Sequence, residues 1–152
     1  MPLYHVAFNG KAGTNTANTP IANLWCAATK ARLIEVGVFL QTVTATAPLF
    51  ALQRSTTRGT QSTTLTPIKK DEDDAATTVV LDTAWSANPT FSTANPQVRC
   101  GAIALAAGNG VIWNLDEMEV GKVGTAGGMA LFNVNATGAT LGSYAGYFYF
   151  AE

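Results

Sequence analysis

His5 is the only histidine of the chain, so any acid–base chemistry that needs an imidazole would have to use it. It stands between Tyr4 and Val6 in a stretch typical of a β-strand, which favours a structural role. One histidine and two distant cysteines give no zinc-binding spacing. No other evident acid–base couple is present. The sequence therefore predicts no catalytic residue, no metal site, no cofactor and no enzymatic activity.

The run Asp71–Asp74 is a cluster of carboxylates, the ligands that calcium prefers. An EF-hand loop starting at Asp71 fails, because Ala76 takes the place of the turn glycine and Ala75 the place of a ligand. The run is therefore expected to be solvated. The glycine-rich stretches 121–124 and 127–128 match neither the phosphate-binding loop nor the dinucleotide fingerprint, and we interpret them as turns.

Composition and charge exclude further classes of function. Charged residues make up 12% of the 152 residues and the net charge is -1, with no basic stripe for phosphates, so no nucleic-acid partner is expected. No apolar run approaches the roughly 20 residues of a membrane helix, so no membrane partner is expected. The start of the chain lacks the pattern of a signal peptide, which predicts assembly in a cytoplasm. In such a reducing compartment Cys26 and Cys100 are expected to be buried free thiols, although the sequence alone cannot exclude a disulfide.

The hydrophobic pattern is that of strands, not helices. In Leu33–Gln41, Ile34, Val36, Val38 and Leu40 alternate with more polar residues, and Phe39 is an apolar exception on the second face. Similar short runs recur between turn signals, which predicts an all-β chain folded as an antiparallel β-sandwich. Asn109-Gly110 between two apolar runs predicts a tight hairpin.

The domain organisation follows from the same pattern. Residues 21–152 are expected to form a single β-sandwich domain, and residues 1–20 an N-terminal strand or a partly extended arm. The stretch Lys11–Thr19 lacks a large apolar side chain, which favours the arm, whereas Leu3–Phe8 would suit a core strand. Ser55–Asp74, mostly Thr and Ser, is interpreted as a long loop.

The C-terminal strand carries aromatic residues on both faces. Alternation places Tyr147 and Tyr149 on one face and Phe148 and Phe150 on the other. One face belongs to the domain core. The other is covered either by a second subunit, since tyrosine favours interfaces, or by the domain's own loops.

Several stretches resemble runs found in small virion proteins of tailed bacteriophages. A strand ending in Arg54-Ser55 leads into Gly59-Thr60 and then Thr66-Pro67, and an Asp- and Ala-rich segment follows at 73–76. An Asn-Pro-Thr-Phe turn at Asn88–Phe91 and an aromatic last strand at Tyr147–Glu152 complete the likeness. The resemblance covers roughly the second and third quarters of the chain and its end. Lys69-Lys70 departs from the more neutral approach to the acidic segment that the resemblance implies.

The resemblance implies a head decoration (cement) protein: a jelly-roll-like domain, usually a trimer, on the outside of the capsid. On this hypothesis the partners are the major capsid protein and two further copies of the chain. Tyr147 and Tyr149 are candidates for the subunit interface, and Lys11, Thr14 and Asn15 for contact with the capsid. The alternative is a tail- or fibre-associated module that binds carbohydrate, with Trp85 or Trp113 as the sugar platform.

Overall fold

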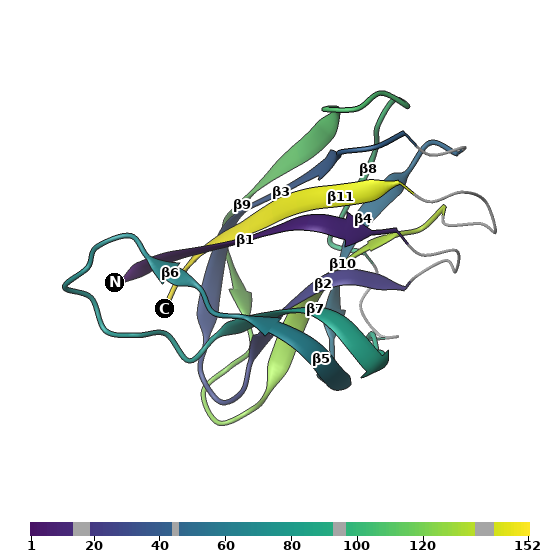
Figure 1. Ribbon diagram of the computed structural model, residues 1–152. Coiled ribbons are helices and arrows are strands. Elements are labelled where there is room, and N and C mark those ends of the chain that lie inside the picture. The colour runs from purple at the N-terminus through teal and green to yellow at the C-terminus, as the bar shows by residue number, and fades with distance from the viewer. Residues whose placement is uncertain (14–18, 44–45, 93–96, 136–141) are drawn as a thin grey trace.

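The chain folds into two antiparallel β-sheets that pack face to face, as the sequence predicts (Figure 1). The computed structural model describes residues 1–13, 19–43, 46–92, 97–135 and 142–152. Across these ranges the regular structure consists of strands. No helix long and apolar enough to cross a membrane is found in the described residues.

Each sheet collects strands from the whole length of the chain. The first sheet has the order β6-β1-β11-β3-β9, and its strands are β1 (Leu3–Ala12), β3 (Ala31–Leu40), β6 (Ile68–Lys69), β9 (Gly110–Val120) and β11 (Ser143–Ala151). The second has the order β5-β7-β2-β10-β4-β8, and its strands are β2 (Pro20–Cys26), β4 (Leu49–Ser55), β5 (Thr60–Leu65), β7 (Val80–Ala87), β8 (Arg99–Ala102) and β10 (Gly127–Asn133).

Eight of these strands follow the order of a jelly roll. The runs β1-β11-β3-β9 and β2-β10-β4-β8 face each other. The remaining strands, β5 to β7, form an insertion between β4 and β8. In that insertion β5 and β7 lengthen the second sheet beyond β2, and β6 adds a short edge beside β1 (Figure 1).

The core lies between the sheets and is built by alternation along the strands. In β11, Phe148 and Phe150 are fully buried, whereas Tyr147 and Tyr149 point to the outer face and are half-buried, as predicted. Opposite them the second sheet contributes apolar side chains that are also fully buried. These include Leu24, Leu52, Leu81, Met129 and Leu131.

The predicted alternation of β3 is right for Val36, Val38 and Leu40 and wrong for Ile34. The register of β3 against both of its neighbours shifts between Leu33 and Glu35. The shift buries Leu33 completely and leaves Ile34 half-buried. In the adjoining strand β9, Asp116 and Glu117 have positive φ values of 47° and 60°, which is the backbone of a bulge.

The expectation of an N-terminal arm is wrong for the described part of that segment. Leu3–Ala12 is a strand that pairs with both β11 and β6. Tyr4, Val6 and Phe8 are buried in the core, and the Tyr4 hydroxyl donates a hydrogen bond of 2.8 Å to the carbonyl oxygen of Ala75. The apolar alternation of Leu3–Phe8 therefore outweighs the polar stretch that follows it.

Two other sequence interpretations need correction. Ser55–Asp74 is not a loop throughout, because it contains β5 and β6. The exposed side chains of β5 are mostly threonine, whose branched Cβ suits an edge strand without any apolar alternation. Asn109-Gly110 is not a hairpin turn. Its backbone pairs with β3, and the turn lies just before it, where Gly108 has a φ of +87°.

The outer face of the second sheet is covered by its own chain. The segment after β4 lies beside Thr90, whose carbonyl oxygen accepts a hydrogen bond of 2.8 Å from the amide of Thr56. Arg58 in that segment donates two hydrogen bonds, of 2.7 and 2.8 Å, to the fully buried carboxylate of Asp82. Because a buried carboxylate requires a partner, this pair fixes the segment against the sheet.

Both cysteines are free thiols, as predicted. Cys26 is buried, and burial raises the pKa of its thiol to about 11. Cys100 is exposed on the edge strand β8, so the prediction that both are buried is wrong for Cys100.

Replacing Phe8 tests whether β1 belongs to the core. Phe8→Ala should lower the free energy of unfolding by about 3–5 kcal/mol, the usual cost of removing a buried phenylalanine. The matched control is His5→Ala on the exposed face of the same strand, which should change it by less than about 0.5 kcal/mol. Urea unfolding measures both. Equally small effects would mean that β1 is not part of the cooperative core.

Candidate protein-binding face

The outer face of the first sheet carries a set of aromatic and small side chains in register. One row across the strands runs Ile68, His5, Tyr149, Glu35 and Asn114. The next row runs Ala7, Tyr147, Gly37 and Ile112, and a third runs Ala145, Phe39 and Gly110. We call these three rows the tyrosine face.

Tyr147 lies at the centre of the tyrosine face. Its hydroxyl donates a hydrogen bond to the carboxylate of Glu35, and its ring stacks on Phe39 with ring centres 6.4 Å apart. The ring also lies over Gly37, where any side chain would collide with it. In the same way the Phe39 ring lies over Gly110. The two glycines therefore let both rings lie flat against the sheet.

The environment of Tyr147 keeps its phenol protonated. Burial raises the pKa of Tyr147 to about 12, with a further contribution from the hydrogen bond and the negative charge of Glu35. The carboxylate of Glu35 therefore accepts a hydrogen bond from a hydroxyl group and is not paired with a cation in the described residues. Within the three rows no Lys or Arg accompanies Glu35.

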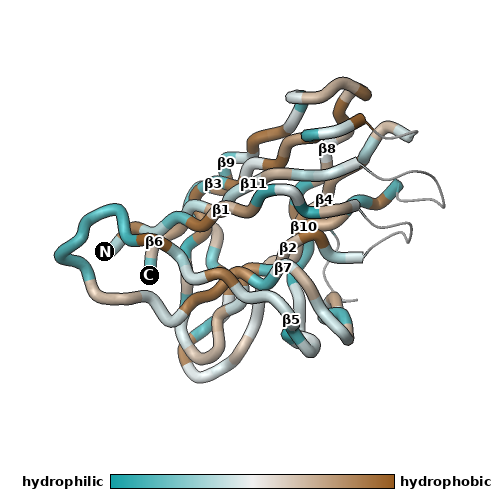
Figure 2. The backbone as a smooth tube through the Cα atoms, viewed as in Figure 1, coloured by the Kyte–Doolittle hydropathy of each residue, from teal (hydrophilic) through white to brown (hydrophobic). Residues whose placement is uncertain are grey.

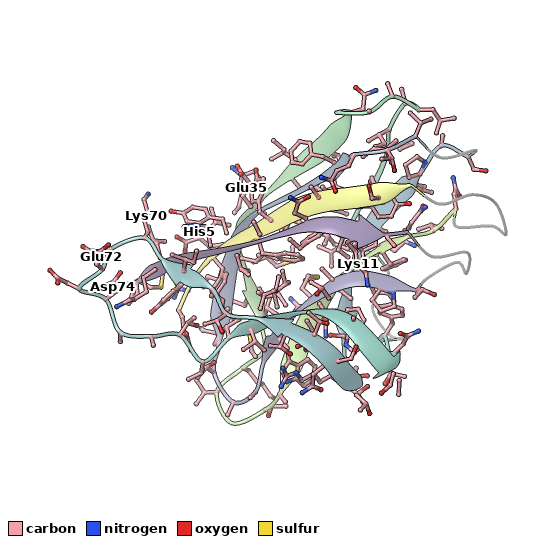
Figure 3. All side chains as sticks on the ribbon, in the orientation of Figure 1. His5, Lys11, Glu35, Lys70, Glu72 and Asp74 are labelled. Atoms are coloured by element: carbon pink, nitrogen blue, oxygen red, sulfur yellow. The ribbon has the colours of Figure 1, made fainter. Side chains whose placement is uncertain are left out.

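Tyr149 is contacted from the insertion between β4 and β8. The ammonium group of Lys70 donates a hydrogen bond of 3.3 Å to the Tyr149 hydroxyl and lies 5.6 Å from the centre of its ring. Figure 3 shows Lys70, His5 and Glu35 on the same side of the sheet. Lys70 therefore marks one border of the tyrosine face.

Two exposed isoleucines lie within the face, at its two edges. Ile112 on β9 is 54% exposed and Ile68 on β6 is 63% exposed. Aromatic and aliphatic side chains around a centre with few charges are the composition of the core of a protein–protein interface. This composition makes the tyrosine face the best candidate for contact with another protein surface.

The acidic run forms the tip of a protruding loop between β6 and β7 (Figures 1 and 2). Lys69 donates hydrogen bonds of 2.7 and 2.6 Å to the backbone carbonyl oxygens of Glu72 and Asp74. The side chain of Lys69 therefore holds the loop by binding the loop's backbone, and the acidic side chains are not needed for this contact. In the described ranges, no three His, Cys, Asp or Glu side chains are placed to hold a metal ion.

The other sequence-predicted candidates lie apart from the tyrosine face. Lys11 lies at the end of β1 in a separate groove of about 380 Å³ between the two sheets, where burial lowers the pKa of its amine (Figure 3). Thr14 and Asn15 lie outside the described residues. His5 makes no hydrogen bond or ion pair to a described residue, and its side chain is exposed.

Neither tryptophan proposed as a sugar platform is freely accessible. Trp113 is 8% exposed and belongs to the core. Trp85 is half-buried, and its indole N–H donates a hydrogen bond of 3.1 Å to the carbonyl oxygen of Arg58.

Sequence reasoning found the two tyrosines and missed their partners. Glu35, Gly37 and Lys70 join the site only through strand register and through the insertion. The one available signal was Phe39, an apolar residue on the polar side of its strand. A comparison with known protein families, with curated proteins and with solved structures found no match to this chain.

Titration of the tyrosines tests the Tyr147–Glu35 pair. Because the folded pKa of Tyr147 lies near 12, above its ordinary value of 10.0, its contribution to stability is complete below about pH 10 and is lost between about pH 10 and 12. Absorbance at 295 nm should show one phenol titrating near pH 12 that disappears in Tyr147→Phe. In Glu35→Gln the same phenol should titrate at lower pH. If the phenol lost in Tyr147→Phe is instead one that titrates near pH 10, the assignment is wrong.

Proposed function

We propose that this chain is a structural protein of a bacteriophage virion that decorates the capsid exterior and reinforces the head. The observation that carries the proposal is the tyrosine face, an aromatic surface with few charges on an open sheet. Such a surface supports binding to a protein, and the likeness to phage virion proteins around Arg54-Ser55 and Tyr147–Glu152 supports the capsid as the place of binding.

Self-association through the tyrosine face is the first part of the proposal. The expected assembly is a homotrimer, in which each copy buries its tyrosines against a neighbour. Burial of aromatic rings supplies most of the binding energy in such contacts. The low share of charged residues, 12%, leaves little repulsion between copies.

Attachment to the major capsid protein is the second part. A protein that binds the intact lattice more tightly than the separated subunits stabilises the lattice by mass action. No chemical step is required for this effect. A jelly roll is also an architecture that capsid-associated domains use, although a fold alone does not decide a function.

A charge placed on the tyrosine face tests self-association. Ile112→Asp introduces a carboxylate at a site that is already 54% exposed, so the monomer should fold while the trimer weakens at least about tenfold. Tyr147→Ala and Tyr149→Ala should weaken it as well. The matched control is Val123→Asp, which adds the same charge at a turn residue that is 82% exposed and lies off the face. Light scattering across a concentration series measures the mass. A wild-type monomer at micromolar concentration would refute the trimer.

Adding the protein back to stripped capsids tests decoration. Capsids without the protein should break at lower temperature or under milder osmotic shock than decorated capsids, because the bound protein favours the closed lattice. Purified protein should restore resistance in a saturable manner. Stripped and decorated capsids that fail at the same temperature would contradict the proposed function.

A further inference from the structure

Most of the cationic side chains already have partners within the chain. Of the nine Lys and Arg residues, six make a hydrogen bond or an ion pair to a described residue. The side chains of Lys11, Arg54 and Lys122 make neither. Because the chain has so few cations, the position of the unpaired ones is informative.

Arg54 and Lys122 line the same groove, which has a volume of about 500 Å³. Arg54 comes from the end of β4, and Lys122 from the turn that joins β9 to β10. Thr56 and Thr125 also line the groove, and the Thr56 hydroxyl already donates a hydrogen bond of 3.3 Å to the carbonyl oxygen of Thr90. Lys30, which binds the Glu119 carboxylate at 2.7 Å, lowers the pKa of Glu119 most, and Arg54 is one of the other cations that lower it.

The floor of the groove is bare backbone because the fold requires glycine there. Gly121 has a φ of +67°, and a Cβ atom at this position would lie 2.7 Å from the carbonyl oxygen of Thr29. At Gly128 a Cβ atom would collide with the buried hydroxyl of Ser55. The turn above them is held by hydrogen bonds of 3.4 and 3.0 Å between the backbones of Lys122 and Thr125. Glycine is therefore required at positions 121 and 128, which both line the groove.

Two cations and the exposed hydroxyl of Thr125 suit one carboxylate. A guanidinium group binds a carboxylate through two parallel hydrogen bonds, and an ammonium group adds a point charge. Two positive charges are too few to follow a nucleic-acid backbone. No aromatic side chain is among the described residues that line the groove, so a sugar ring would have nothing to stack on.

We propose that this groove binds an aspartate or glutamate side chain on an extended segment of a partner protein. The proposal rests on the proposed function as a protein-binding module and names a second contact surface for it. The groove is formed by β4, by the start of β10 and by the turn before it, and shares no residue with the tyrosine face. Self-association through the tyrosine face therefore leaves the groove available to the capsid.

A blocked Gly-Glu-Gly-Asp-Gly peptide is the direct probe, and the matched control peptide carries Gln and Asn in place of Glu and Asp. In NMR titrations of the full chain, the acidic peptide should shift the Arg54 Nε–H signal and the amides of Gly121 and Gly127. The control peptide should not. Binding should weaken at high salt, because it depends on charge. An acidic peptide that shifts no groove signal at millimolar concentration would overturn the proposal.

Charge-removing variants locate the site. Arg54→Gln and Lys122→Gln should each weaken peptide binding by about tenfold. Lys11→Gln removes another unpaired cation, one that lines a separate groove beside β1, and should leave binding unchanged. Lys122 is exposed, so its variant remains informative even if Arg54→Gln lowers stability. Equal weakening by Lys11→Gln would mean that binding depends only on the net charge of the protein, and would overturn the site.

Two further experiments are needed. The first distinguishes a protein segment from other anionic ligands, and the second distinguishes failure of the site from failure of the proposed function. Glucuronate or inorganic phosphate that binds the groove more tightly than the peptide would overturn the assignment to a protein segment. If wild-type protein does not protect capsids but the peptide binds the groove, the proposed function fails and the site stands. If Lys122→Gln protects capsids as well as wild type and no peptide binds, the site fails and the proposed function stands.

Discussion

The pairing of the last strand with the first and third strands is the constraint on which the rest of the structure depends. β11 lies between β1 and β3, and its Phe148 and Phe150 fill the space between the two sheets. Its partners lie more than a hundred residues away in the sequence. Because side chains of a strand alternate, burying the phenylalanines forces Tyr147 and Tyr149 to the outside. The core and the tyrosine face are therefore two consequences of one register.

The sequence could predict the features that depend only on the alternation of apolar and polar residues along a strand. The all-β class, the inward Phe148 and Phe150 and the outward tyrosines follow from a period of two, which needs no knowledge of neighbours. The free state of Cys26 and Cys100 followed from the expected reducing compartment. These features are local, or depend only on the chemistry of a single residue type.

The remaining features depend on contacts between distant segments. The shift at Leu33 in β3 is set by its neighbours β9 and β11, so Ile34 was assigned to the wrong face. The strand β5 has no apolar alternation, because an edge strand with exposed threonines buries little. The partners of Tyr147 and Tyr149 come from β3 and from the insertion, and no spacing in the sequence brings Glu35 or Lys70 to them.

The outer faces of the two sheets differ in how far they are covered. The insertion between β4 and β8 contacts both faces. On the second sheet, Arg58 of the insertion covers the surface and pairs with the buried carboxylate of Asp82. On the first sheet, the described part of the insertion places the short edge β6 and Lys70 beside the outer face, and the aromatic rings next to them stay partly exposed. The partly exposed aromatic rings of the first sheet are the reason for the proposal that another protein binds this face.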